Sequence, residues 1–262
     1  MVSARRALLL TAATLLLAAF PTQAATPLMI WPVDPIITSP QRAVALWLEN
    51  RGERAVSMQV RVFAWAQVDG EEVFNTQKTI AVSPPISHIP PGQRQMVRLI
   101  SVPPPSSERQ EQAFRVLIDE LPASASMEPP APPETPQVAV RLQIRYALPL
   151  FVYGADAVPP RQAGERGIQA SALLQPALSW QLVHQGATPR LLIRNDGTAH
   201  ARITSASWSD GVRSDIPIGR GLLGYVLPHS QMLWPLEQSP PAGHALKATV
   251  NGREAPLSRA AQ

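Results

Sequence analysis

The sequence contains no cysteine, which excludes disulfide bridges, thiolate zinc sites and a cysteine nucleophile. Aromatic residues make up only 5% of the chain, and lysine occurs twice, at Lys78 and Lys247. Arginine therefore carries nearly all of the positive charge. No run of basic residues appears, and aromatic residues are not interleaved with the arginines. The sequence thus gives nucleic-acid binding little support.

Proline, by contrast, is abundant, with 29 residues in a chain of 262. Each proline removes a backbone donor and clashes inside a helix, so this number argues against a mostly helical protein. It suits strands with many edges and turns. The hydrophobic fraction of 45% is enough for a packed core and excludes wholesale disorder. A length near 260 fits one large domain or two of about 100–130 residues.

The first 24 residues have the three-part pattern of a secretory signal peptide. Arg5 and Arg6 form a short basic region, residues 7–20 are an apolar run, and small residues precede a cleavage position after Ala24. A membrane anchor is the alternative, but this run is short for a span of about 20 residues. No later stretch reaches 18 apolar residues. We therefore expect cleavage, and a mature protein without stable membrane insertion.

Apolar and polar residues alternate along both halves of the remaining chain, which predicts half-buried β-strands. Turn residues separate these short segments, and this combination indicates two β-sandwiches of immunoglobulin type. We expect an N-terminal domain at 25–157 and a C-terminal domain at 165–262. The predicted strands cover 43–48, 56–65, 95–100, 113–121 and 138–152 in the first half, and 191–194, 201–208, 225–227, 232–234 and 246–250 in the second. The proline-rich stretch 122–137 is interpreted as a long connection between two strands.

Candidate chemical sites are few. The five histidines have no metal-ligand spacing, and neither a nucleophile elbow nor a glycine-rich phosphate loop occurs. A glycan hydrolase would need a carboxylate pair in a cleft, and none is apparent. We therefore expect neither an enzyme nor a bound metal or cofactor. A secreted protein with two sandwiches and no such site most often binds other proteins.

One strand has an unusual apolar ladder. Val138, Val140, Leu142 and Ile144 recur at period two. One interpretation is an ordinary strand whose apolar residues fill the domain's own core. The other is an edge strand that presents the ladder to a partner, since natural edges are normally blunted by charge, proline or bulges. Such a strand would act by β-augmentation, in which main-chain hydrogen bonds give affinity and alternate side chains fill the partner's pockets.

Several segments resemble one protein family. Residues 89–99 (IPPGQRQMVRL) resemble the P-P-G-x-x-x-x-V-R stretch of periplasmic pilus-assembly chaperones of the chaperone–usher pathway. Residues 117–122 (LIDELP) resemble the family's strand that ends in an acidic residue and a proline, and 138–152 resembles its donor strand. Residues 30–35 (IWPVDP) and 145–149 (RYALP) are most similar to the archaic subgroup, which serves spore-coat-protein-U-like pilins.

The resemblance implies an all-β protein with two immunoglobulin-like β-sandwich domains in a boomerang arrangement, located in the periplasm. Such a chaperone lends its edge strand to a pilin subunit that lacks its own last strand, and caps the subunit until an outer-membrane usher exchanges it. The donor residues would be Val138, Val140, Leu142 and Ile144, and the partners pilin subunits and the usher. Self-association of the free edge stays open. The alternative is a structural or adhesive immunoglobulin-like module of a surface assembly.

The family also uses charged side chains, and the resemblance extends to some of them. Basic residues in its interdomain cleft hold the subunit's terminal carboxylate, with an arginine early in the first strand. Residues 30–37 contain no arginine, so Arg115 and Arg145 become the candidate anchors. Arg98 and Glu120 match the family's internal charge pair and are expected to be structural.

Overall fold

The alternating segments of the sequence form β-strands in the structure, a computed structural model. It describes residues 27–105, 110–122, 143–155, 157, 159, 174–186, 188–212, 215–219 and 221–260. Within these ranges the regular elements are all strands, and no helix is long and apolar enough to cross a membrane. The predicted signal peptide and most of the proline-rich connection lie outside them. The prediction of an all-β protein is confirmed.

The N-terminal sandwich has two sheets. The first contains, in spatial order, β1 (Leu28–Trp31), β3 (Ala43–Asn50), β8 (Arg94–Ser101) and β6 (Ile80–Ser83). The second contains β2 (Ile36–Thr38), β10 (Arg145–Tyr153), β9 (Glu111–Leu121), β4 (Val56–Val68) and β5 (Glu71–Asn75), with β7 (Ile86–Ile89) paired to β4. The chain changes sheets between β1 and β2, so its first two strands lie in different sheets.

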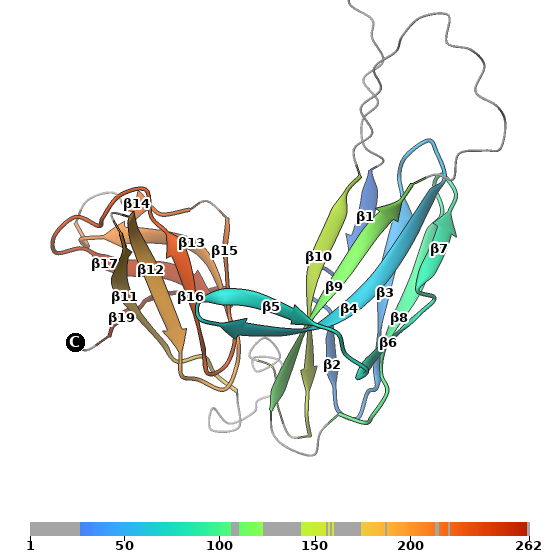
Figure 1. The fold of residues 1–262 in the computed structure, drawn as a ribbon, viewed down its shortest axis with the longest axis horizontal. Coiled ribbons are helices and arrows are strands. Elements are labelled where there is room, and N and C mark those ends of the chain that lie inside the picture. The colour runs from blue at the N-terminus through green and yellow to red at the C-terminus, as the bar shows by residue number, and fades with distance from the viewer. Residues whose placement is uncertain are drawn as a thin grey trace, which may run out of the picture.

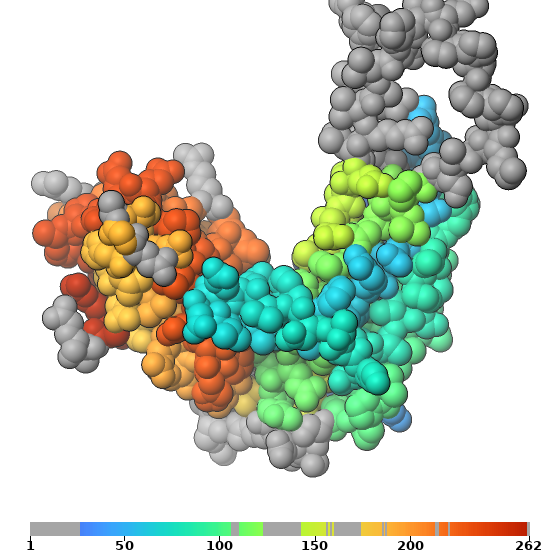
Figure 2. Space-filling model, in the orientation of Figure 1, coloured from blue at the N-terminus to red at the C-terminus, as the bar shows by residue number. Residues whose placement is uncertain are grey.

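The C-terminal sandwich also has two sheets. One contains β16 (Ser230–Pro235), β12 (Thr188–Asn195), β11 (Leu178–Gln185) and β19 (Ser258–Arg259). The other contains β14 (Ile216–Pro217), β13 (Ala201–Ser209), β17 (Ala245–Val250) and β18 (Arg253–Pro256), with β15 (Leu222–Val226) paired to β13. The two lobes are joined at one end and diverge at the other (Figure 1), and the space-filling view is hollowed between them (Figure 2). The expected boomerang of two sandwiches is thus confirmed.

Each sandwich has its own core, built from the apolar face of each strand. In β4 the residues at even positions from Val56 to Val60 are buried, and Val62 and Ala64 pack against the same core, as the period-two pattern predicts. Leu46 and Val97 from the first sheet and Ile118 from the second are fully buried in this core. A separate core in the C-terminal sandwich includes Leu191, Ile203 and Leu246.

Two buried asparagines end equivalent strands in the two domains. Asn50 ends β3 and Asn195 ends β12, and neither is exposed. The Asn195 amide donates to the carbonyls of Ala199 (2.8 Å) and Val226 (3.1 Å), while its oxygen accepts from the backbone of Ala177 and Gly197 (both 3.0 Å). Asn50 makes a similar set of bonds to backbone groups around its own turn. Each side chain therefore pairs buried backbone groups that the strand ends leave without a ladder partner.

Replacing Asn195 with alanine should lower the free energy of unfolding of the C-terminal domain by about 2–4 kcal/mol, because several buried backbone groups lose their partners. Urea unfolding followed by tryptophan fluorescence measures the change. The control is Gln238→Ala, at an exposed turn position, which should change stability little. Equal stability of Asn195→Ala and the parent protein would contradict this account of the turn.

Candidate functional site: an open strand edge

Strand β10 is paired on one side only over much of its length. It pairs with β9 throughout, from Arg145 opposite Asp119 to Tyr153 opposite Glu111. On its other side β2 pairs only with residues 151–153. Among the described residues, 145–150 therefore have no strand on that side. This is an unpaired sheet edge, of the kind that proteins usually shield.

The register shows which backbone groups face this open edge. The Glu120 N–H donates to the Ile144 carbonyl (3.3 Å), which makes Arg145 and Asp119 a pair that exchanges no hydrogen bonds. The N–H and C=O of Arg145 and of Ala147 therefore point away from β9. Farther along, the Phe151 N–H points the same way and donates to the Pro35 carbonyl (3.3 Å). Between Ala147 and Phe151, Pro149 occupies the other position whose backbone faces away from β9. Its lack of an N–H therefore breaks no bond to β9.

The even-numbered side chains of β10 form a continuous apolar face. Leu150 and Val152 are buried in the core of the N-terminal sandwich. Leu148 and Tyr146 are only partly buried and pack against the same core, and Ile144, just before β10, is also partly exposed. The face thus becomes more exposed toward the end of β10 that lies beside the open edge.

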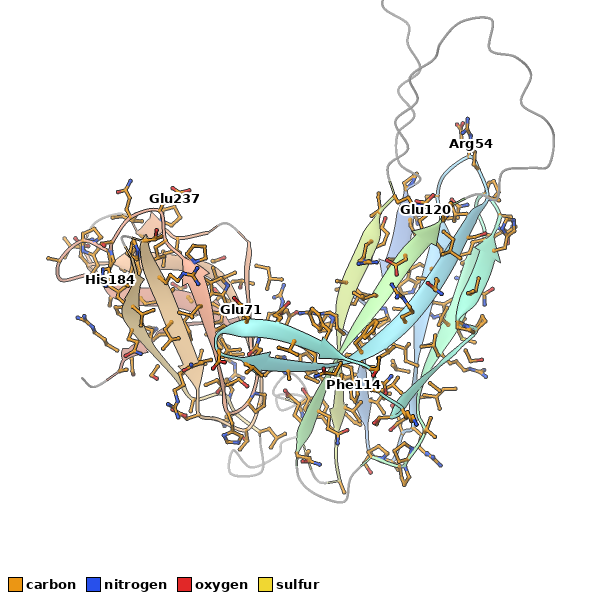
Figure 3. All side chains as sticks on the ribbon, viewed as in Figure 1. Arg54, Glu71, Phe114, Glu120, His184 and Glu237 are labelled. Carbon is orange, nitrogen blue, oxygen red and sulfur yellow. The ribbon has the colours of Figure 1, made fainter. Side chains whose placement is uncertain are left out.

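Of the four predicted donor residues, only Ile144 lies within the described part of the chain; Val138, Val140 and Leu142 lie outside it. Ile144 is an even-numbered residue like Tyr146 and Leu148. The predicted ladder therefore continues the exposed part of the apolar face in the same alternation. Glu120, which bonds to Ile144, lies at the end of the N-terminal domain remote from the C-terminal domain (Figure 3).

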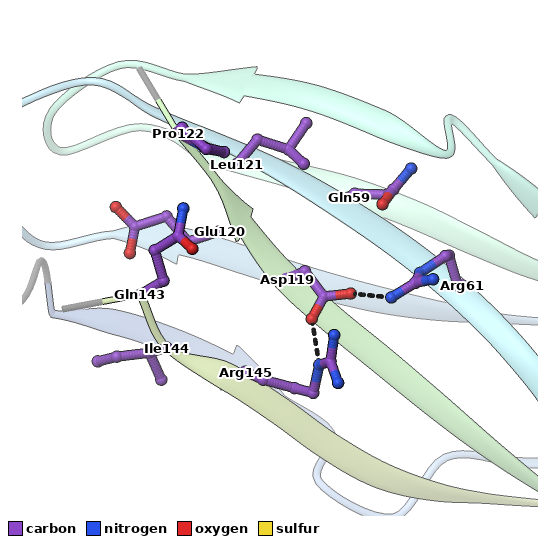
Figure 4. Close-up of a pocket in the computed structure, with 9 residues that line it drawn as sticks. All are labelled: Gln59, Arg61, Asp119, Glu120, Leu121, Pro122, Gln143, Ile144 and Arg145. Carbon is purple, nitrogen blue, oxygen red and sulfur yellow. Dashed lines mark hydrogen bonds and ion pairs between the residues drawn. The ribbon is translucent and has the colours of Figure 1, made fainter. Parts of the chain in front are cut away.

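A charged cluster occupies the outer face of the same sheet. Asp119 on β9 accepts from Arg61 on β4 (2.7 Å) and from Arg145 on β10, and the three side chains border a shallow pocket (Figure 4). Burial acts to raise the pKa of the Asp119 carboxyl. The hydrogen bonds and charges of Arg145 and Arg61 outweigh this effect and hold the pKa below its ordinary value. The cluster thus fixes an ionised carboxylate between two strands.

Arg145 and Arg115, the two candidate anchors, have different surroundings. The Arg145 side chain is 60% exposed despite its bond to Asp119. The Arg115 side chain is only 10% exposed, donates to Glu72 (2.7 Å) and has its guanidinium carbon 3.8 Å from the centre of the Trp65 ring. Burial lowers the pKa of Arg115, and the attraction of Glu72 opposes this effect. Only Arg145 presents an accessible guanidinium.

The expected charge pair between Arg98 and Glu120 is not formed. Arg98 lies on β8 in the first sheet and Glu120 on β9 in the second. Val97 and Leu99 fill the core from β8, so Arg98 between them points outward and is exposed. The described residues include no ion pair between the two side chains. The outer-face pairs Arg115–Glu72 and Asp119 with its two arginines occur instead.

Within the described ranges no group of three or more histidine, aspartate or glutamate side chains is arranged to hold a metal ion. The prominent feature of the N-terminal domain is therefore a strand edge with an apolar face on one side and a charged face on the other. Such an edge can accept another strand through its backbone.

Comparisons with known proteins give matches to pilus-assembly chaperones. Residues 29–156 match the family model for the pili and flagellar-assembly chaperone, PapD N-terminal domain. The chain is 27% identical to a chain in the crystal structure of the CsuC–CsuE chaperone–tip adhesion subunit pre-assembly complex, from archaic chaperone–usher Csu pili of Acinetobacter baumannii. That match covers 90% of this chain and 100% of the other, with a TM-score of 0.69. The sequence has no significant match among curated proteins.

More distant structures share the fold. A chain in the complex of the Salmonella enterica SafA pilin with the SafB chaperone is 16% identical, with 90% of this chain and 97% of that chain covered and a TM-score of 0.57. The Pseudomonas aeruginosa CupB2 chaperone is 15% identical, with coverage of 87% and 96% and a TM-score of 0.53.

The lowered pKa of Asp119 predicts a pH-dependent contribution to stability. A depressed carboxyl pKa stabilises the fold above the pKa of the unfolded chain, about 3.9, and this gain is lost as the pH falls through the folded value. Asp119→Asn should therefore lower stability at pH 7 by up to about 1 kcal/mol, and by less at pH 3. Denaturant unfolding at a series of pH values measures the difference.

Asp196→Asn is the matched control for this prediction. The Asp196 side chain is 57% exposed in its pair with Arg194, so its replacement should cost less at pH 7. A difference between Asp119→Asn and the parent protein that stayed constant from pH 7 to pH 3 would contradict the assignment.

Proposed function

Because residues 29–156 match the family model for the pili and flagellar-assembly chaperone N-terminal domain, we propose that this protein caps pilin subunits by donor-strand complementation at the open edge of β10. The observation that carries the proposal is the half-paired strand, with free backbone groups at Arg145 and Ala147 beside a partly exposed apolar face. A subunit that lacks one strand has the complementary defect, a groove with unpaired backbone groups on its sides.

The donor residues in this proposal are Val138, Val140, Leu142 and Ile144, and Tyr146 and Leu148 continue the same face. Each buried apolar side chain contributes about 1.5–3 kcal/mol. Each main-chain hydrogen bond adds about 0.5–1.5 kcal/mol. Together they support a stable complex that a better-fitting strand can still displace.

We further propose a periplasmic location, an outer-membrane usher as the recipient of the capped subunit, and spore-coat-protein-U-like pilins as the subunits. The predicted signal peptide and the residues shared with the archaic subgroup support these assignments. A structural or adhesive module of a surface assembly is not favoured, since such a module would have this strand paired on both sides.

Replacing Ala147 with proline tests the edge directly. The Ala147 N–H faces the open side, so proline breaks no bond to β9, and Pro149 already occupies the next equivalent position. The substitution removes one donor and places a ring where an added strand must lie. We expect at least about tenfold weaker capture of a strand-deficient pilin, measured by titration, with little change in unfolding free energy.

The matched control is Ala147→Val, which keeps the N–H and the open edge. It should capture the pilin nearly as well as the parent protein. Full capture by Ala147→Pro would show that the subunit binds elsewhere. Failure of the parent protein to form a one-to-one complex with its pilin on co-expression would reject the proposed function itself.

Arg145 and Arg115 stay the proposed anchors for the subunit's terminal carboxylate. Arg145 is the favoured one, because its side chain is exposed and that of Arg115 is largely buried. Arg145→Gln should weaken capture about tenfold, the effect of losing a charged hydrogen bond. Its effect on stability should be below about 1 kcal/mol, because the side chain is largely exposed. The same titration measures capture, with Arg194→Gln in the C-terminal domain as the control. Unchanged capture would remove Arg145 as the anchor.

A further inference from the structure

The β4–β5 hairpin reaches from the N-terminal domain to the C-terminal domain. We propose that it is a strap that fixes the angle between the two domains, and that Gln67 is the positioning residue through which it supports subunit capture. The part that concerns capture rests on the proposed function. Figure 1 shows the hairpin crossing between the lobes, and Glu71 at its tip lies against the C-terminal domain in Figure 3.

Gln67 connects the domains through both ends of its amide. It is 9% exposed, its nitrogen donates to the Tyr225 carbonyl (2.9 Å), and its oxygen accepts from the Leu227 N–H (2.8 Å). Both partners are backbone groups at the end of β15. A side chain that satisfies one donor and one acceptor at the same time fixes both position and orientation, which a single bond does not.

The hairpin tip makes a second, independent contact. The Leu233 N–H donates to the Gly70 carbonyl (3.2 Å), and Gly70 forms a parallel bridge with Met232. The tip thus pairs with β16, the outer strand of its sheet. Gly70 has φ +84°, and a Cβ there would lie 2.5 Å from Leu233 Cδ1. Only glycine fits this position without movement of Leu233.

The base of the hairpin is fixed to the sheet that carries the open edge. Trp65 packs edge-on against Tyr225 (centroids 5.5 Å apart) and in a tilted arrangement against Phe151 on β10 (6.1 Å). Arg115 on β9 stacks on Trp65 and bonds to Glu72 on the returning strand. The hairpin therefore cannot rotate freely on its own sheet.

A separate tie joins the domains away from the hairpin. The Glu111 carboxylate, which is fully buried, accepts from the His200 backbone N–H (3.0 Å) and contacts its ring Nδ1 (2.9 Å). The His200 ring stacks on Phe151 with 3.6 Å between centroids. A buried apolar cluster shared by the domains, which includes Tyr153 and Leu227, surrounds this tie. The hairpin adds a further point of attachment at its tip, away from that cluster, and so limits rotation about it.

Fixed domain geometry bears on capture because the open edge belongs to one lobe of a hollowed molecule (Figure 2). Domains of one chain move relative to each other unless their contacts hold them, and the hairpin is one of these contacts. Without it, a subunit seated on β10 would have to order the domains on binding, and that cost reduces affinity. Because the strap orders the domains in the free protein, binding of a subunit does not incur this cost.

The test is Gln67→Ala. Small-angle scattering of the free protein should show a broader distribution of domain separations, while the melting of each domain stays close to that of the parent. Affinity for the strand-deficient pilin should fall about tenfold. Gln93→Ala, at an exposed turn, is the matched control and should change neither measurement. Should Gln67→Ala not fold, Gln67→Met serves instead, because it nearly preserves the side-chain volume and removes both hydrogen bonds.

The outcomes separate the strap from the function. If Gln67→Ala leaves the distribution of domain separations unchanged, the strap proposal is rejected, whatever its affinity for the pilin. Broader scattering with undiminished capture overturns the positioning role and leaves the proposed function intact. Absence of capture by the parent protein rejects the proposed function, and the positioning role with it. Broader scattering together with weaker capture supports the inference.

Discussion

The molecule depends on a row of backbone groups that its own sheet leaves unpaired. A strand edge in water is satisfied by solvent, but it is also a template for any chain with a complementary edge. In this protein the free groups at Arg145 and Ala147 lie next to a face that passes from buried Leu150 to partly exposed Tyr146. Polar pairing and apolar burial are thus offered at the same place, and a partner gains from both.

The structure also limits how far this edge extends. Strand β2 covers the last three residues of β10. Pro149, just before this covered part, has no N–H to donate to an added strand. Proline and a short covering strand are usual means of blunting an edge. They close the open edge on the side toward Tyr153, so that a partner strand must pair with the residues before Phe151.

The sequence was sufficient for what depends on local periodicity. The strand at 56–65 and its buried face followed from alternation, and so did the assignment of two sandwiches. The pairing of residues on distant strands does not follow from local alternation. Arg98 and Glu120 carry opposite charges, but Val97 and Leu99 fill the core from either side of Arg98 and turn it outward, away from the second sheet.

Contacts between distant residues left no local pattern either. Gln67 reads as one more polar residue at the end of a strand, yet its partners lie about 160 positions away. Glu111 and His200 are separated in the same manner. The donor residues Val138, Val140 and Leu142 stay a prediction, because they lie outside the described residues.

Strand β9 connects the open edge to the contacts between the domains. Its outward residues Glu111, Arg115 and Asp119 are spaced four apart and lie on one face. The first binds His200 of the C-terminal domain, the second holds the base of the strap, and the third holds Arg145. From Glu111 to Asp119, β9 also pairs with β10. The strand that holds the domain contacts is therefore the direct neighbour of the strand with the open edge, and a partner strand added to that edge would extend the same sheet. The interdomain contacts and the open edge thus belong to one sheet.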